Sequence, residues 1–311
     1  ILRGGVMTSN GTTMRMFCNS VSKKNQLTIP ANSTALLEGN YTSLWIQLPG
    51  SSASSMKKAS LDIKGGTLKG NTYAFYDYSF GDGWDNVEYN ITGGKFIGGI
   101  WSYKGYNTEN PYKFLTGGTF SQNPQNYVAD GYVSYFDDAA QVWKIKLEDV
   151  AQVGDVMYTS LVDAFEAAQA GDEVKMVKNM YIEATVPAPY GNKCGIKQNG
   201  EILNGQNYNL YLTTVGDQYT IMTSGGTIKN LTIASGFRAI LLMYPQTDVY
   251  IDNVTSGPNV CYAINTAEQG NPDARIIATN STFLGWCSFS LIASASFTNC
   301  KFGQGTYYTN T

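Results

Sequence analysis

The sequence predicts an all-β protein, specifically a right-handed parallel β-helix built in two segments. Three observations favour this prediction. Short phrases recur along the chain at intervals of about two dozen residues. Glycine (33), tyrosine (22) and many asparagine, threonine and serine residues are typical of strands broken by tight turns. Hydrophobic residues make up 43% and charged residues 14% of the chain, a composition that predicts an ordered protein.

A glycine-pair phrase recurs in the first half of the chain. It occurs at 61–68, 89–96 and 113–120, and its shape returns at 224–228. The glycine pairs of the first three copies lie 28 and then 24 residues apart. Helical repeats need a nearly constant length, whereas a β-solenoid coil can lengthen its loops freely. The unequal spacing therefore favours stacked coils of short strands.

In the second half the phrase becomes an apolar residue, one further residue and an asparagine. The asparagines are Asn230, Asn253, Asn280 and Asn299, at spacings of 23, 27 and 19 residues. Asparagine and glycine both tolerate positive φ, so both are expected at the corners between strands. Stacked asparagine side chains can also hydrogen-bond along the row.

Stacking predicts two columns of inward side chains. Successive coils of a parallel sheet lie about 4.8 Å apart, and a single coil has neither a backbone partner nor a closed core. The expected columns are Ile228, Ile251, Ala278 and Phe297, and then Leu231, Val254, Ser281 and Cys300.

Several asparagines have a competing interpretation, because they lie in Asn-x-Ser/Thr glycosylation sequons. These are Asn10, Asn32, Asn40, Asn90, Asn230, Asn253 and Asn280. Sequons arise often by chance in a chain so rich in asparagine and threonine, and the corner role explains the periodic ones. We therefore prefer the structural interpretation.

The repeated phrases are interrupted by a junction at 133–158, which separates a first β-helix segment (1–132) from a second (159–311). Apolar stretches on both sides of 137–140 predict a β-hairpin. A short helix is predicted near residues 159–170, capped by Thr159 or Ser160 and ended by Gly171. Its apolar stripe is Leu161, Ala164, Phe165 and Ala168. We expect this helix to cover the open end of the second segment.

Residues 112–180 resemble a family of large bacterial surface proteins, frequent in gut bacteria, with parallel β-helix (pectin-lyase-like) repeats. The stretch from Thr116 to Tyr132 looks like the closing phrase of one module, and that from Gly154 to Val174 like the opening phrase of the next. The resemblance implies export and a role at the cell surface, such as adhesion or glycan contact. It carries over no catalytic residue.

The most unusual stretch combines aromatic rings with carboxylates at 73–86 and continues at 101–106. Sugar rings present apolar C–H faces flanked by hydroxyls, so aromatic residues beside Asp and Asn suit carbohydrate. The candidate ligand-binding residues are Tyr76, Asp77, Tyr78, Asp82, Trp84, Asp85, Trp101 and Tyr103. Two alternatives are open: rings that simply pack on the outside of a sheet, and a cation site at Asp77, Asp82 and Asp85, whose spacing matches no calcium loop closely.

A polysaccharide-degrading enzyme, a lyase or a glycoside hydrolase, is the rival class. Carboxylates in adjacent coils would lie about 5 Å apart, as retaining glycosidases require. Alignment on the glycine pairs places Asp62 beside Asn90, Phe114 and Met222. Alignment on the corner asparagines places Asp252 beside Lys229, Thr279 and Thr298. Neither row holds two carboxylates, so we expect no catalytic residues.

Composition argues against several other classes of function. The chain has no histidine, and its five cysteines lack CxxC spacing, so we expect no metal site, no cofactor and no disulfide framework. The cysteines are Cys18, Cys194, Cys261, Cys287 and Cys300, which we expect to be small buried apolar residues. A net charge of −3 without basic clusters argues against nucleic-acid binding, and no apolar run is long enough to span a membrane.

The sequence thus predicts a secreted, non-catalytic protein of the bacterial cell surface. Its expected partner is a polysaccharide or a host surface protein, and a purely structural stalk is the plainer alternative. We expect the signal and anchor regions to lie outside this chain, because its first residues read as the middle of a strand and turn.

Overall fold

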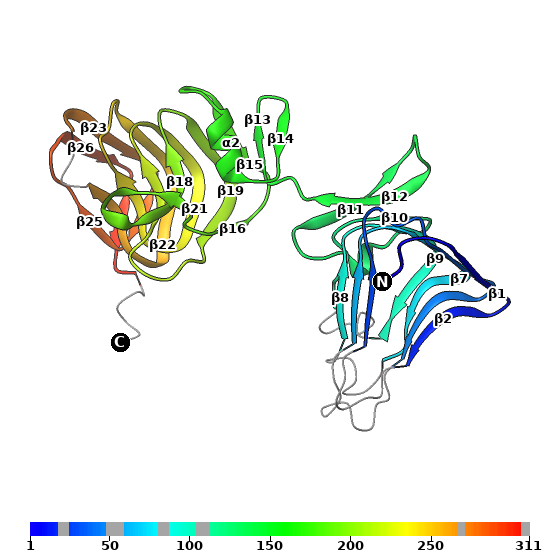
Figure 1. Cartoon of the computed structure of the whole chain (residues 1–311). Coiled ribbons are helices and arrows are strands. Elements are labelled where there is room, and N and C mark those ends of the chain that lie inside the picture. Colours follow the sequence, from blue (N-terminus) through cyan, green and yellow to red (C-terminus); the bar gives the residue numbers. More distant parts are fainter. Residues whose placement is uncertain (18–24, 48–58, 80–86, 104–111, 267–270, 306–311) are drawn as a thin grey trace. The chain divides into compact units, whose positions relative to one another are not determined.

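The computed structural model describes residues 1–17, 25–47, 59–79, 87–103, 112–266 and 271–305. These residues are mostly β-strand, as the sequence predicts (Figure 1). They form two compact units, residues 1–148 and residues 149–311. The boundary between the units falls inside the predicted junction at 133–158.

Most strands of unit 1 pair in parallel with strands that are distant in sequence. β1, β4, β7, β9 and β10 pair in that order, β2 pairs with β5 and β5 with β7, and β3, β6 and β8 form a separate sheet. The strands are β1 (Val6–Ser9), β2 (Thr12–Phe17), β3 (Gln26–Ile29), β4 (Leu36–Gly39), β5 (Thr42–Gln47), β6 (Ala59–Ile63), β7 (Thr67–Asp77), β8 (Val87–Ile91), β9 (Lys95–Ser102), β10 (Thr119–Phe120), β11 (Tyr132–Asp137) and β12 (Val142–Leu147).

The core of unit 1 consists of side chains aligned from strand to strand. Leu37, Leu68, Phe96 and Phe120 occupy one register position on β4, β7, β9 and β10, and each is buried. The rings of Phe96 and Phe120 stack with centroids 5.0 Å apart. Like positions of successive strands thus share one interior column, which removes their apolar surface from water.

The predicted corner role of the glycine pairs is confirmed in unit 1. The second glycine of each pair has positive φ, +72° at Gly66, +92° at Gly94 and +109° at Gly118. The first glycines approach the neighbouring backbone closely, and a Cβ on Gly117 would lie 2.2 Å from the carbonyl oxygen of Thr92. Glycine suits the first position because it has no Cβ, and it suits the second because it adopts positive φ without strain.

The predicted hairpin is also confirmed. β11 and β12 pair antiparallel, with Phe136 opposite Trp143 and their rings 5.4 Å apart. β12 also pairs antiparallel with β10, so the hairpin covers the last parallel strand of unit 1.

Unit 2 repeats the parallel pattern over more strands. β15, β19, β21, β22, β23 and β26 pair in parallel in that order, as do β18, β20 and the end of β21. Its elements are β13 (Ala151–Val153), β14 (Val156–Tyr158), α2 (Leu161–Ala167), β15 (Glu173–Met176), β16 (Met180–Ile182), β17 (Val186–Pro187), β18 (Lys193–Gln198), β19 (Ile202–Leu212), β20 (Tyr219–Thr223), β21 (Gly226–Leu242), β22 (Val249–Thr266), β23 (Asn271–Thr279), β24 (Thr282–Leu284), β25 (Trp286–Ser288), β26 (Ile292–Thr298) and β27 (Lys301–Gly303).

The asparagine row of unit 2 is confirmed in backbone conformation, and its predicted hydrogen bonding is confirmed in part, because the Asn280 amide donates to Asp252 at 2.9 Å. Asn230, Asn253, Asn280 and Asn299 all have φ between +51° and +53°. The Asn253 amide donates to the side-chain oxygen of Asn230 at 2.9 Å, and the Asn299 amide donates to that of Asn280 at 2.8 Å.

The two inward columns of unit 2 are confirmed as well. Ile228, Ile251, Ala278 and Phe297 align strand by strand, and the first three are buried. In the second column the hydroxyl of buried Ser281 accepts from the backbone N–H of Val254 at 3.0 Å.

The predicted helix is present as α2, somewhat shorter than expected. The Ser160 hydroxyl caps it by accepting from the N–H of Asp163 at 3.3 Å, and Leu161, Ala164 and Phe165 pack into the core of unit 2. The helix ends at Ala167 because Ala168 adopts an extended conformation.

Candidate binding surface

A surface of aromatic rings lies on the outer side of β5, β7 and β9. Alternation along β5 buries Leu44 and Ile46 and turns Trp45 outward. Strand register then aligns Trp45 with Tyr76 and Tyr76 with Trp101. We call the six residues of this surface the aromatic face: Trp45, Tyr73, Tyr76, Tyr78, Trp101 and Tyr103.

The rings of the aromatic face contact one another. Tyr76 lies nearly parallel to Trp101, with centroids 5.0 Å apart at 24°, and to Tyr78, at 6.1 Å and 8°. Tyr103 stands across Tyr78 and Trp101, at 78° and 67°. Tyr78 and Tyr103 are the most exposed members, at 38% and 37%. The surface therefore combines mutual packing with solvent-accessible rings.

A cation borders the aromatic face on β2. Arg15 is aligned with Trp45, and its guanidinium carbon lies 4.9 Å from the centroid of that ring. The same guanidinium donates to the side-chain oxygen of Gln47. Arg15 thus supplies hydrogen-bond donors beside apolar ring surface.

Asp77 does not belong to this surface, although the sequence placed it among the ligand-binding residues. Its side chain points inward and is completely buried, because it alternates with the outward Tyr76 and Tyr78. It accepts from the hydroxyl of Ser102 at 2.8 Å and from the N–H of Ser79 at 3.0 Å. Burial raises the pKa of this carboxyl, and the hydrogen bonds from Ser79 and Ser102 oppose that shift. Asp77 therefore links strands inside the unit.

The structure brings together Tyr76, Tyr78, Trp101 and Tyr103 of the predicted residues. Asp82, Trp84 and Asp85 lie outside the described residues, and the cation site proposed for Asp77, Asp82 and Asp85 loses Asp77 to the core. Sequence reasoning missed Trp45 and Arg15, and it placed Tyr73 in the aromatic stretch without choosing it as a ligand-binding residue. Trp45 could have been found, because it stands between two aliphatic residues in a strand-like alternation.

A polar hollow of about 540 Å³ lies at the corner between β4 and β5. It is lined by Thr8, Ser9, Asn10, Glu38, Gly39, Asn40 and Asn71. The Asn71 amide donates to the side-chain oxygen of Asn40 at 2.8 Å, and Lys69 donates to Glu38 at 2.6 Å. Asn40 precedes Tyr41, whose ring lies 6.3 Å from that of Tyr73. Amide and carboxylate groups are therefore available near one end of the aromatic face.

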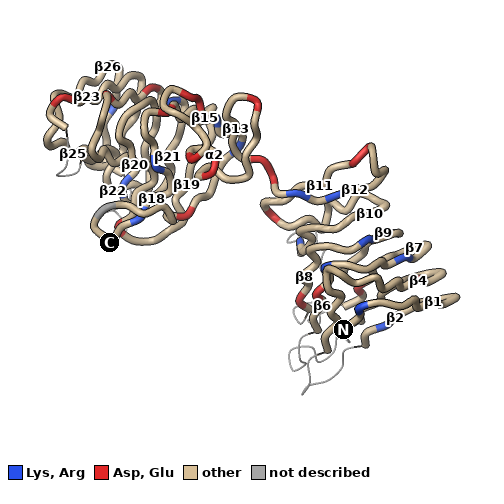
Figure 2. Tube along the Cα trace, turned by 45° about the horizontal axis from the view of Figure 1, so that its top comes forward, with Lys and Arg blue, Asp and Glu red and all other residues tan. Residues whose placement is uncertain are grey.

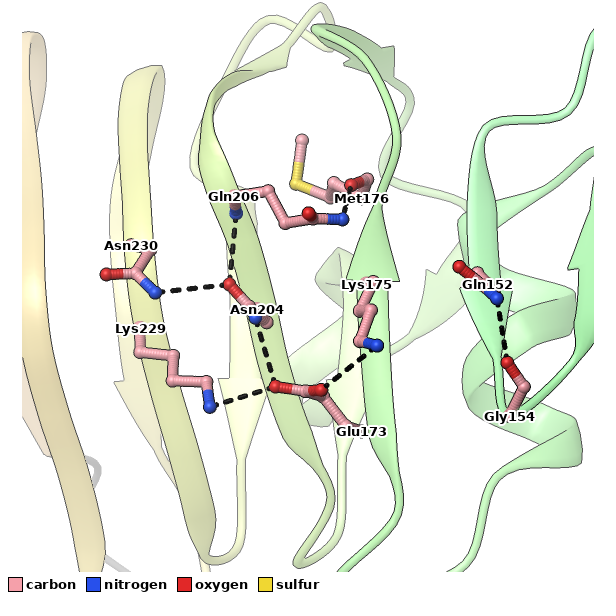
Figure 3. Close-up of polar contacts among 9 residues, drawn as sticks. All are labelled: Gln152, Gly154, Glu173, Lys175, Met176, Asn204, Gln206, Lys229 and Asn230. Carbon is pink, nitrogen blue, oxygen red and sulfur yellow. Dashed lines mark hydrogen bonds and ion pairs between the residues drawn. The ribbon is translucent and has the colours of Figure 1, made fainter.

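Two carboxylates of unit 2, Glu173 and Asp252, are held by hydrogen bonds from neighbouring side chains. Glu173 accepts from Lys229 at 2.8 Å and from the Asn204 amide at 3.0 Å, with Lys175 at 3.5 Å (Figure 3). The hydrogen bond from Lys229 holds the pKa of Glu173 below its usual value. An acid that stays ionised is poorly suited to donate a proton in catalysis.

The two rows predicted to lack paired carboxylates can now be placed. Asp62 aligns with Asn90 and accepts from its amide at 2.7 Å. Asp252 aligns with Lys229 and Thr279, as expected. The predicted alignment of Asp62 with Met222 is wrong, because Met222 belongs to unit 2 and pairs there with Lys197 and Leu241.

Other residue types give little chemistry within the described ranges. Four cysteines are free thiols, and burial raises the pKa of Cys194 to about 11. No group of three or more His, Cys, Asp and Glu residues in those ranges could hold a metal ion. Lys and Arg are scattered along the trace (Figure 2). None of the described helices is long and apolar enough to cross a membrane.

Comparisons with protein-family models, with curated proteins and with solved structures give no match to this chain.

Proposed function

We propose that the chain is a two-segment right-handed parallel β-helix from a bacterial surface protein, and that its aromatic face binds a glycan. Three features support the fold: parallel pairing of strands distant in sequence, interior columns of like positions, and corner residues with positive φ. A coil that stacks on its neighbour accounts for all three.

The observation that carries the glycan proposal is the aromatic face. Six aromatic residues lie on the outer side of three adjacent strands, where alternation would otherwise favour polar residues. Apolar C–H groups of a sugar can pack on such rings, while Arg15 and Gln47 at the border offer polar partners. A surface so rich in half-exposed rings suits a ligand with apolar and polar sides.

The sequence resemblance adds the cellular setting. The closing and opening phrases between 112 and 180 resemble those of bacterial surface β-helix proteins, and the resemblance implies export. The engagement of Glu173 and Asp252 by lysine, threonine and amide groups supports the non-catalytic role that we propose. The mutual packing of the rings supports a structural stalk as the second candidate.

Binding to a panel of glycans, before and after substitution, tests the proposal. Trp101→Ala and Tyr78→Ala are expected to reduce binding at least tenfold, because each removes a ring of the aromatic face. Trp286→Ala and Tyr181→Ala are matched controls, since both side chains are more exposed and belong to unit 2. The controls should bind as the parent chain does.

Three outcomes would contradict the proposal. Binding that survives both unit 1 substitutions would move the glycan site elsewhere. No binding to any glycan would favour the stalk. Cleavage of a polysaccharide by the purified chain would overturn the non-catalytic assignment.

A further inference from the structure

Unit 2 contains a groove that the aromatic face does not involve. It has a volume of about 440 Å³ and lies over the outer side of β18, β20 and the end of β21. Its lining residues are Pro187, Ala188, Lys197, Gln198, Asn199, Met222, Thr223, Ser224, Met243, Tyr244 and Gln246. This volume falls in the range of small-molecule sites, which is about 300–1,000 Å³.

The floor of the groove is apolar, although it faces away from the main core. Register aligns Lys197, Met222 and Leu241 as outward residues of three adjacent strands. Met222, Leu241 and Met243 are nevertheless buried, in an outer cluster that also contains Cys194 and Tyr219 and packs against Val186 and Ala188. The segment that carries β17 pairs antiparallel with β18 and forms one wall of the groove. Methionine side chains adapt their shape to an apolar ligand.

The rim of the groove is polar and carries one kind of charge. Asn199 accepts from the Ser224 hydroxyl at 2.9 Å, and the Gln246 amide donates to the carbonyl oxygen of Tyr244 at 2.9 Å. Lys197 is the only charged residue among those that line the groove, and no ion pair in the described residues engages it. The groove therefore complements a ligand with one negative charge.

A smaller hollow of about 120 Å³ adjoins the groove. Its lining limits where the negative charge of a ligand can lie. Lys197 and Asn199 line both spaces, and Val162, Phe165, Glu166 and Val186 complete the smaller one. The carboxylate of Glu166 repels an anion that extends toward α2. A bound anion would consequently rest at Lys197 with its body over Met222 and Met243.

We propose that this groove binds a monocarboxylate with an apolar tail. The carboxylate contacts Lys197, and the tail packs on Met222, Met243, Pro187 and Ala188. A phosphate dianion suits the groove less well, because a single lysine leaves part of its charge without a partner. The proposal is independent of glycan binding, since it concerns other residues in the other unit.

Isothermal titration of the full chain with sodium octanoate tests the proposal, with octanamide as the uncharged probe of similar shape. Octanoate is expected to bind saturably, and at least tenfold more tightly than octanamide. Lys197→Met should weaken octanoate at least tenfold and leave octanamide unchanged. Glu166→Gln should tighten octanoate about twofold to fivefold, because it removes a repulsive charge.

Lys193→Met is the matched control. Lys193 lies on the same strand, is exposed and does not line the groove, so its loss should change binding by less than twofold. Unfolding midpoints of all variants establish that they are folded. The proposal is overturned if octanoate does not bind, if octanamide binds equally well, or if Lys193→Met and Lys197→Met have equal effects.

Discussion

The buried carboxyl of Asp77 should make unit 1 sensitive to pH in an unusual direction. Most paired carboxylates stabilise a fold as pH rises, because the native state favours their ionised form. Burial instead raises the pKa of Asp77 above its usual 3.8. Between 3.8 and that higher value the folded chain keeps a proton that the unfolded chain has lost. Stability contributed by this group is therefore present at low pH and lost as pH rises.

The magnitude follows from one proton. A single group changes the free energy of unfolding by at most about 1.4 kcal/mol per pH unit while its protonation differs between the two states. Asp77→Asn keeps the shape but cannot titrate, so this slope should disappear. Asp77→Ala should destabilise unit 1 by about 2–5 kcal/mol, because it removes the buried carboxylate to which the Ser102 hydroxyl and the Ser79 N–H donate.

Urea unfolding followed by tryptophan fluorescence from pH 4 to pH 8 measures both effects. Four of the five tryptophans, at 45, 84, 101 and 143, precede the unit boundary, so the signal reports mainly on unit 1. Asp138→Asn is the control, since Asp138 is exposed in the hairpin turn. Parallel pH profiles for the parent chain and Asp77→Asn would refute the reasoning.

Three further predictions concern corners and thiols. Asn253→Ala should destabilise unit 2 by about 1–2 kcal/mol, because alanine is strained at a φ of +51°. Scanning calorimetry should show a smaller loss of stability for Asn253→Gly, and equal losses would contradict the backbone explanation. Gly117→Ala should destabilise unit 1 by about 3 kcal/mol, because its Cβ would meet the Thr92 carbonyl oxygen, whereas Gly11→Ala, with open space around it, should have little effect in the same urea assay. Burial raises the pKa of Cys194 to about 11, so its thiol should resist iodoacetamide at pH 8 in the folded chain. Peptide mapping should find Cys194 alkylated only after unfolding, and rapid labelling of the folded chain would contradict this prediction.

The sequence allowed prediction of the parts of the fold that depend on backbone conformation and on alternation. The positive φ of Asn253 and Gly94, the inward columns and α2 all follow from rules that act on a few residues at a time. The end of α2 was harder to predict, because Ala168 continues the apolar stripe but turns extended.

The candidate site was predictable only in part. Aromatic composition indicated Tyr76 and Trp101 as candidate residues. Alternation along the strand, however, turns Tyr76 outward and buries its neighbour Asp77. Arg15 and Trp45 joined the surface through pairing between strands about 30 residues apart, which a local pattern does not encode. The groove at Lys197 also depends on such pairing. One of its walls is the segment that carries β17, which lies outside the repeated phrases and could not be predicted from them.

The corner asparagines of unit 2 keep the same backbone conformation although they are spaced 23, 27 and 19 residues apart. The number of residues between successive asparagines can therefore vary while their backbone conformation stays the same. New peptide inserted at 289–291, between β25 and β26, would extend outward as an appendage and leave the pairing of β26 with β23 unchanged.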